Sequence, residues 1–135
     1  MTMGYEIGQE LPPVAGPRLR RLDIAYMAVA MDDPNEVHTE DDVARASGMP
    51  QVIAHGTFPL AYGGAAVTRQ FGFGAVRRYG LRLTAPVFPG DELTTNLRVS
   101  EVEELEDGQR LELDVTVRKQ DDTVVGRGSA QVVVS

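Results

Sequence analysis

The sequence of 135 residues contains no cysteine and no tryptophan, and it lacks a long apolar run. The absence of cysteine excludes thiolate metal sites, disulfides and a cysteine nucleophile. The longest apolar stretches, 24–31 and 60–67, are far shorter than the roughly 20 residues of a membrane-spanning helix, and no basic segment precedes an apolar one near the N-terminus. We therefore expect a cytoplasmic protein that has no membrane partner.

Basic residues are outnumbered, since 13 Lys and Arg stand against 20 Asp and Glu for a formal net charge of −7. This balance argues against nucleic-acid binding, which depends on neutralising phosphates. The block 43–90 is the exception, because it contains no Asp or Glu. Its five arginines are Arg45, Arg69, Arg77, Arg78 and Arg82. Such a block is typical of a small anionic partner, but also of a buried segment with arginines at its rim, and charge alone leaves both interpretations open.

Glycine and proline divide the chain, whose length suits a single domain over 1–135. The Gly- and Pro-rich stretch 5–17 predicts an extended arm with at most one short edge strand. A helix is predicted over 24–31, where good helix formers follow Asp23, a residue type that caps helix N-termini.

An irregular segment, 32–38, is predicted after that helix because it begins with Asp-Asp-Pro. Thr39 and Asp42 have the spacing of a capping box, with Asp in place of the usual Glu. They predict a short helix that stops at Gly48.

The next predicted helix, 57–70, is of a different kind, because Arg69 is its only charged residue. A helix that is apolar nearly all round is buried. Pro59 lies in the first turn, where its missing N–H costs little. Gly63 and Gly64 give the helix a thin waist, which lets a sheet approach its backbone closely.

The remainder of the chain alternates between apolar and polar residues, as strands do. The predicted strands are 76–83, 91–105, 110–120 and 123–134. Short polar turns join the last three, which therefore form an antiparallel meander. The expected fold class is α+β, with an antiparallel sheet wrapped around a central buried helix.

Only two histidines are available for catalysis, and both lie in predicted loops. His38 shares one irregular turn with Asp33 and Asn35. A carboxylate, an amide and an imidazole confined to one turn can jointly hold a water molecule. The competing interpretation is a solvated turn with a surface histidine.

His55 and Gly56 come immediately before the buried helix. The free N–H groups of a first helical turn, aided by the helix dipole, can stabilise a developing anion. The Gly56 N–H is therefore a candidate for an oxyanion hole. The His55 side chain is open to a simpler interpretation, in which a backbone carbonyl satisfies it at the helix start.

These residues resemble a known family, the MaoC-like hotdog family of (R)-specific enoyl-CoA hydratases and (3R)-hydroxyacyl thioester dehydratases. The resemblance rests on two spaced motifs and a later segment. The residues that carry it are Asp33-x-Asn35-x-Val37-His38, Ala44, Gly48, Ile53-Ala54-His55-Gly56, 82–87 and Pro89-Gly90-Asp91. The family pattern usually has Gly before the Asp and Pro after the Asn, whereas Asp32 and Glu36 occupy those positions here.

The resemblance implies a single hotdog domain and a hydro-lyase of fatty acid metabolism. Water would add to a trans-2-enoyl thioester to give the (R)-3-hydroxyacyl thioester, or the reverse dehydration would take place. No separate cofactor and no metal are implied, because coenzyme A or phosphopantetheine belongs to the acyl-CoA or acyl-carrier-protein substrate. The catalytic residues would be Asp33, His38, Asn35 and Gly56, and the substrate-binding residues Ala54, His55, Arg69, Arg77, Arg78 and Arg82.

Three functional hypotheses remain open on the sequence. The chain is an active homodimeric hydratase, the catalytic subunit of a heteromeric hydratase formed by two hotdogs, or a non-catalytic hotdog that binds acyl thioesters. A dimer is expected because one hotdog is half of a unit whose sheet pairs with a second copy. A metal site built from Asp33, His38 and His55 is a minor fourth possibility.

Overall fold

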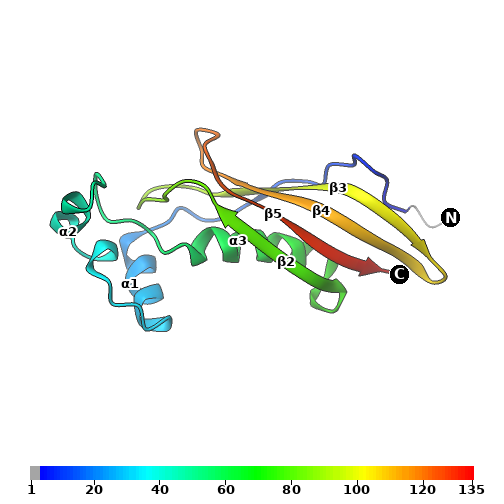
Figure 1. Cartoon of the computed structure of the whole chain (residues 1–135), viewed down its shortest axis with the longest axis horizontal. Coiled ribbons are helices and arrows are strands. Elements are labelled where there is room, and N and C mark those ends of the chain that lie inside the picture. The colour runs from blue at the N-terminus through cyan, green and yellow to red at the C-terminus, as the bar shows by residue number, and fades with distance from the viewer. Residues whose placement is uncertain (1–3) are drawn as a thin grey trace.

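The computed structural model describes residues 4–135, which form one antiparallel sheet curved around a long helix (Figure 1). The five strands pair in the order β1-β3-β4-β5-β2. They are β1 (Val14–Ala15), β2 (Val76–Leu83), β3 (Thr94–Leu105), β4 (Gly108–Arg118) and β5 (Val124–Val134). The helices are α1 (Arg21–Ala30), α2 (Asp41–Ala46) and α3 (Thr57–Phe71), with short 3-10 turns at Glu36–His38 and Phe73–Ala75. The α+β class and the meander of the last three strands are confirmed.

Helix α3 packs on the inner face of the sheet, as its apolar composition predicts. The inward residues of β4 are all buried, namely Leu111, Leu113, Val115 and Val117. Gly63 is a point of close approach, since a methyl group there would collide with the hydroxyl of Tyr79 on β2. That hydroxyl donates a hydrogen bond to the Leu60 carbonyl at 2.6 Å. The predicted waist is therefore where the sheet meets the helix.

The start of α1 differs from the prediction by three residues. The helix begins at Arg21, and Asp23 occupies its third position instead of capping it. From there the Asp23 carboxylate reaches back to accept from the Arg20 N–H at 2.8 Å. A carboxylate in the first turn can satisfy the free N–H groups from inside as well as from the cap.

The predicted capping box at Thr39 is wrong. Helix α2 begins at Asp41 after Glu40, and no side chain caps it. Thr39 instead ends the 3-10 turn, and Asp42 pairs with Arg45 at 3.3 Å. The helix end is as predicted, because Gly48 has a left-handed φ of 90° directly after it.

The two edges of the sheet differ. β1 is only two residues long and continues the extended arm, which confirms the short edge strand. β2 is eight residues long and, among residues 4–135, it pairs with β5 alone.

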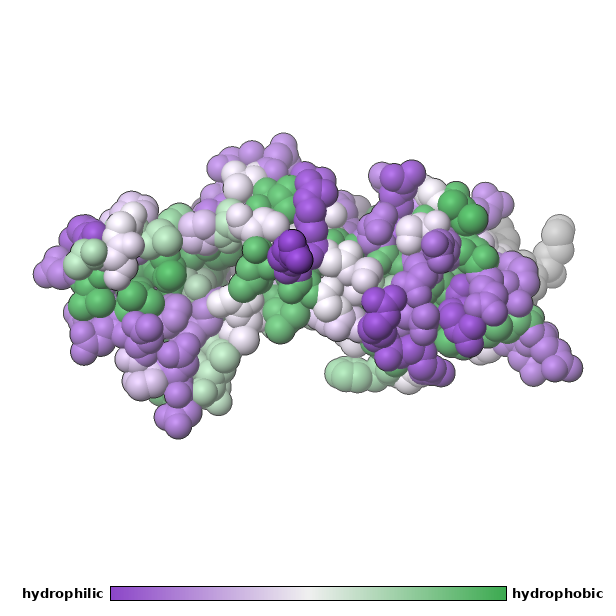
Figure 2. Space-filling view, in the orientation of Figure 1, coloured by the Kyte–Doolittle hydropathy of each residue, from purple (hydrophilic) through white to green (hydrophobic). Residues whose placement is uncertain are grey.

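The space-filling view shows apolar patches between polar areas over both the helical end and the sheet (Figure 2). No helix in the described part of the chain is long and apolar enough to cross a membrane.

Candidate active site

The segment between α1 and α2 is an ordered loop held by its own polar groups. Asp33 is anchored through its N–H, which donates to the Ala28 carbonyl of α1 at 2.9 Å. Its Oδ1 accepts from the Asn35 N–H at 3.3 Å, and Asn35 Oδ1 accepts from the Val37 N–H at 3.1 Å. Asn35 thus caps the 3-10 turn that carries His38. Its contacts support the loop that carries the histidine.

The His38 ring is fixed by the segment that precedes α3. Its Nδ1 lies 2.7 Å from the Ile53 carbonyl oxygen. A carbonyl only accepts hydrogen bonds, so Nδ1 carries the proton and Nε2 of the neutral ring is an acceptor. That Nε2 lies 3.8 Å from Asp33 Oδ2. The Asp33 and His38 side chains are 41% and 11% exposed, so the pair borders solvent.

His55 lies against the same carboxylate, an arrangement that the sequence motifs do not indicate. Its ring stacks on His38 with centroids 3.7 Å apart and planes 21° apart, and its Nε2 is 3.9 Å from Asp33 Oδ2. The residue is 3% exposed, yet within residues 4–135 neither ring nitrogen has a hydrogen-bond partner. No carbonyl of this part of the chain therefore satisfies His55 with a full hydrogen bond. Burial, and secondly the neighbouring His38, lower the pKa of His55, while the nearby Asp33 backbone and the Asp33 charge oppose the shift.

The three side chains also have to be considered as metal ligands. One donor atom from each of Asp33, His38 and His55 lies within 4.8 Å of those of the others. The imidazole lone pairs, however, lie in the ring planes, and these two rings are nearly parallel. Parallel lone pairs do not converge on one tetrahedral ion. The geometry suits three groups that share a proton or a water molecule.

The N-terminus of α3 lies beside this cluster. Gly56 adopts helical angles, with φ −59° and ψ −18°. Among the described residues, no acceptor takes the N–H of Gly56 or of Thr57. A methyl group on Gly56 would meet the tip of the Leu83 side chain, so β2 ends directly over this helix start. The N–H of Ala54, in contrast, is already bonded to the Val87 carbonyl at 2.7 Å.

The four candidate phosphate-binding arginines are not gathered at one place. Arg82 is adjacent in sequence to Leu83, at the end of β2 nearest the cluster, and it faces Arg127 across the β2–β5 pair. Arg77 and Arg78 lie at the other end of β2, where Arg77 binds the Gly74 carbonyl and Arg78 pairs with Glu112 at 2.6 Å. Arg69 lies in the last turn of α3, roughly 20 Å from the helix start at 1.5 Å per residue.

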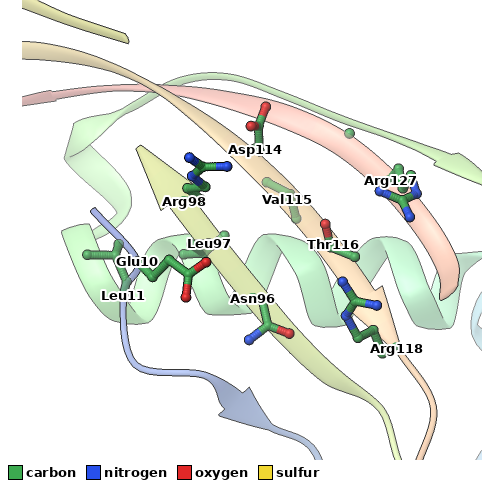
Figure 3. A pocket seen from close by; sticks show the side chains of 11 residues that line it. Glu10, Leu11, Asn96, Leu97, Arg98, Asp114, Val115, Thr116, Arg118 and Arg127 are labelled. Atoms are coloured by element: carbon green, nitrogen blue, oxygen red, sulfur yellow. The ribbon is translucent and has the colours of Figure 1, made fainter. Parts of the chain in front are cut away.

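The two larger grooves described for the single chain lie away from the histidines. One, of about 630 Å³, is on the face of the sheet opposite α3 and is lined by Arg98, Asp114, Thr116, Arg118 and Arg127 on three neighbouring strands (Figure 3). The other, of about 1200 Å³, lies around the C-terminal end of α3. Neither is lined by Asp33, His38 or His55, so neither groove belongs to the candidate active site.

A family model described as a MaoC like domain matches residues 4–123. The chain belongs to the MaoC-like family. Of two curated relatives of this MaoC-like protein, one has a name that states no activity and the other is named as an enzyme. A UPF0336 protein of Clavibacter michiganensis is 32% identical over 112 residues, which cover 76% of this chain and 75% of the relative. Enoyl-CoA hydratase ChsH3 of Mycobacterium tuberculosis is 29% identical over 131 residues, but these cover 93% of this chain and only 43% of ChsH3.

Solved structures place the MaoC-like chain among the hotdog folds. R-hydratase PhaJ1 from Pseudomonas aeruginosa matches with a TM-score of 0.81 and 28% identity, over 96% of this chain and 82% of that one. The ChsH1-ChsH2 complex from Mycobacterium tuberculosis matches with a TM-score of 0.76 and 23% identity, over all of both chains. The second likeness concerns the fold alone, and it shows that this hotdog fold occurs in a complex of two named partners.

Proposed function

We propose that this protein adds water to trans-2-enoyl thioesters to give (R)-3-hydroxyacyl thioesters, or catalyses the reverse dehydration. The observation that carries the proposal is the pairing of Asp33 and His38, 3.8 Å apart, beside the Gly56 N–H, which no acceptor takes within residues 4–135. Two proton carriers next to an anion-binding helix start are what this addition requires. The family, with its hydratase relatives, supports the same reaction class.

In the addition of water, the Asp33–His38 pair transfers the protons and the Gly56 N–H stabilises the negative charge. A water molecule held by Asp33 and His38 loses one proton to this pair as its oxygen bonds to C3 of the substrate. The electron pair of the C2=C3 bond moves toward the thioester oxygen, whose negative charge the Gly56 N–H stabilises. The enolate then collapses as C2 takes the proton back from the pair. One water is consumed, the protein is unchanged, and dehydration follows the same steps in reverse.

A second hotdog completes the unit in this proposal. β2 is a long edge strand whose outer side is unpaired within residues 4–135, and such edges join sheets between subunits. The Asp33 side chain is 41% exposed on the single chain, so a partner would supply the remaining wall around the acyl group. The partner is a second copy of this chain or a related hotdog chain, in which case this chain is the catalytic half.

The carrier part of the substrate is an anionic phosphopantetheine, as coenzyme A or on an acyl carrier protein. Arg82 is the arginine whose backbone lies nearest the α3 start, and within residues 4–135 it makes no ion pair with a carboxylate. Its side chain alternates with that of Leu83 and lies on the outer face of the sheet with Arg127, so contact with the carrier would be made from that face. Arg77 and Arg78 already bind protein groups. We therefore expect Arg82→Ala to raise KM for the thioester more than the same change at Arg77 or Arg78.

The experiment is hydration of crotonyl-CoA and longer 2-enoyl-CoA esters by the purified protein, with chiral analysis of the product. Asp33→Asn and His38→Ala should each lower kcat by about 10²- to 10⁴-fold with the fold intact. Glu36→Gln is the matched control, because it removes an exposed carboxylate from the same turn. Full activity in either dyad variant refutes the proposal. If the protein is inactive alone and a co-expressed hotdog restores turnover, the heteromeric form is the correct one.

A further inference from the structure

His55 is a buried side chain whose polar atoms have no partner. Within residues 4–135, its two ring nitrogens are the only buried side-chain nitrogen or oxygen atoms that lack a hydrogen bond. Leaving such groups unpaired is unfavourable, and buried polar atoms without a protein partner are usually met by water or ligand. The ring faces the candidate active site, because its Nε2 points to the Asp33 carboxylate.

The distances around Asp33 Oδ2 leave room for one water molecule. His38 Nε2 and His55 Nε2 lie 3.8 and 3.9 Å from this oxygen, beyond direct hydrogen bonding. One donor atom of each of the three residues lies within 4.8 Å of the others. These distances allow a water oxygen to lie at about 3 Å from all three atoms, because hydrogen bonds tolerate a departure from the ring plane that coordination to a tetrahedral ion does not.

The protonation states assign a role to each contact of this water. His38 Nε2 is an acceptor because its Nδ1–H is bonded to the Ile53 carbonyl. An ionised Asp33 is also an acceptor, so the two protons of the water point to these two groups. Only a donor can make the third contact, which goes to the water oxygen. A neutral His55 with its proton on Nε2 is such a donor, and the burial that lowers the pKa of His55 favours the neutral ring.

We propose that His55 is a third holder of the reacting water, donating its Nε2–H to the water oxygen while Asp33 and His38 accept the two water protons. One lone pair of the water then remains free, and it is directed at C3 of the substrate. This inference rests on the proposed hydration, and it gives His55 a part in the reaction instead of a contact with the acyl carrier. Gly56 follows His55 in the sequence, so the residue that holds the water is directly followed by the residue whose N–H stabilises the oxyanion.

The test uses three substitutions that separate the contacts of His55. The amide nitrogen of His55→Gln extends about as far as Nε2, that of His55→Asn extends only as far as Nδ1, and His55→Phe keeps a ring on His38 without any N–H. We expect His55→Gln to retain kcat within about tenfold, and the other two to lose on the order of 10²-fold with KM little changed. A His55→Phe enzyme as active as wild type, or equal losses in Gln and Phe, would overturn the proposal.

Nitrogen-15 NMR of the wild-type histidines tests the proposal without any turnover. We expect His55 to be neutral with the proton on Nε2 at pH 7, and His38 to have its proton on Nδ1. A charged His55, or one protonated on Nδ1, overturns the role of His55 and leaves the Asp33–His38 hydration intact. If the expected tautomers are found but no enoyl thioester is hydrated, the proposed function fails while the three-point water site stands.

Discussion

Replacing Gly56 with proline tests the oxyanion hole, because it deletes one N–H and keeps the backbone. The φ of Gly56 is −59°, inside the range of about −65 ± 15° that a proline ring imposes. In the described structure this N–H has no acceptor, so no native hydrogen bond is lost. Gly56→Ala is the matched control, since it adds a Cβ at the same place and retains the donor.

The added carbon is common to both variants and its cost is small. It meets Cδ1 of Leu83, the free end of a side chain that is 49% exposed and can rotate away. We expect the two variants to unfold within a few degrees of each other. Proline differs from alanine by the missing donor and by two ring carbons, and these carbons would raise KM if they obstructed the substrate, whereas removal of one oxyanion-hole donor costs about 10²–10³ in kcat, or roughly 2.7–4 kcal/mol.

The assay is the initial rate of enoyl-CoA hydration at several substrate concentrations, alongside thermal melting of each variant. The proline variant should lose kcat relative to the alanine variant with a similar KM, because the donor acts on charge that develops in the transition state. Equal kcat values in the two variants refute the assignment of the Gly56 N–H. Loss of activity in both, with normal melting, shows that the space in front of Gly56 is needed by the substrate.

Two further predictions concern stability. Gly63→Ala should destabilise the protein by about 1–3 kcal/mol, because its methyl group collides with the Tyr79 hydroxyl. Gly64→Ala should be near neutral, because its methyl group meets the Tyr79 ring at 3.3 Å. If urea unfolding gives the opposite order of stability, the close approach of sheet and helix at Gly63 is refuted. Burial raises the pKa of Asp91, but hydrogen bonds and the 3.0 Å ion pair with Lys119 outweigh it and hold the pKa below its usual value. The stability that the ionised Asp91 contributes is present above about pH 4 and is lost as the pH falls through the lowered pKa. Asp91→Ala should therefore lower the free energy of unfolding by about 3–5 kcal/mol at pH 7 and by far less near pH 2. An equal loss at pH 7 and pH 2 would refute this contribution of the ion pair.

The fold is largely predictable because its signals are regular. Alternation over β4 and the glycine pair in α3 each specify a face and a close approach, and both are found. Helix starts are less predictable, since several nearby residues can satisfy the same free N–H groups. Asp23 stabilises α1 from its third position, and Thr39 ends one turn where it was expected to begin a helix. Local chemistry therefore identifies an element more reliably than its first residue.

The candidate site is predictable in its parts but not in its assembly. The two motifs mark Asp33, His38 and Gly56, yet no spacing in the sequence places the two histidine rings face to face. That arrangement depends on contacts between separate segments, because the Ile53 N–H donates to the Val37 carbonyl at 3.1 Å while its carbonyl accepts from His38. These two bonds align the segments, so the residues that follow Ile53 and Val37 meet beside one carboxylate.

The two positions at which this chain departs from the motif are explained by the loop itself. Asp32 has a φ of 51°, a left-handed conformation that glycine adopts freely and that Asp tolerates better than most residues. Glu36 is the first residue of the 3-10 turn, where the fixed φ of proline suits a turn start and Glu is also accommodated. Neither side chain is part of the contacts that hold Asp33, Asn35 and His38. The loop therefore keeps its geometry with Asp and Glu, and the departures do not argue against catalysis.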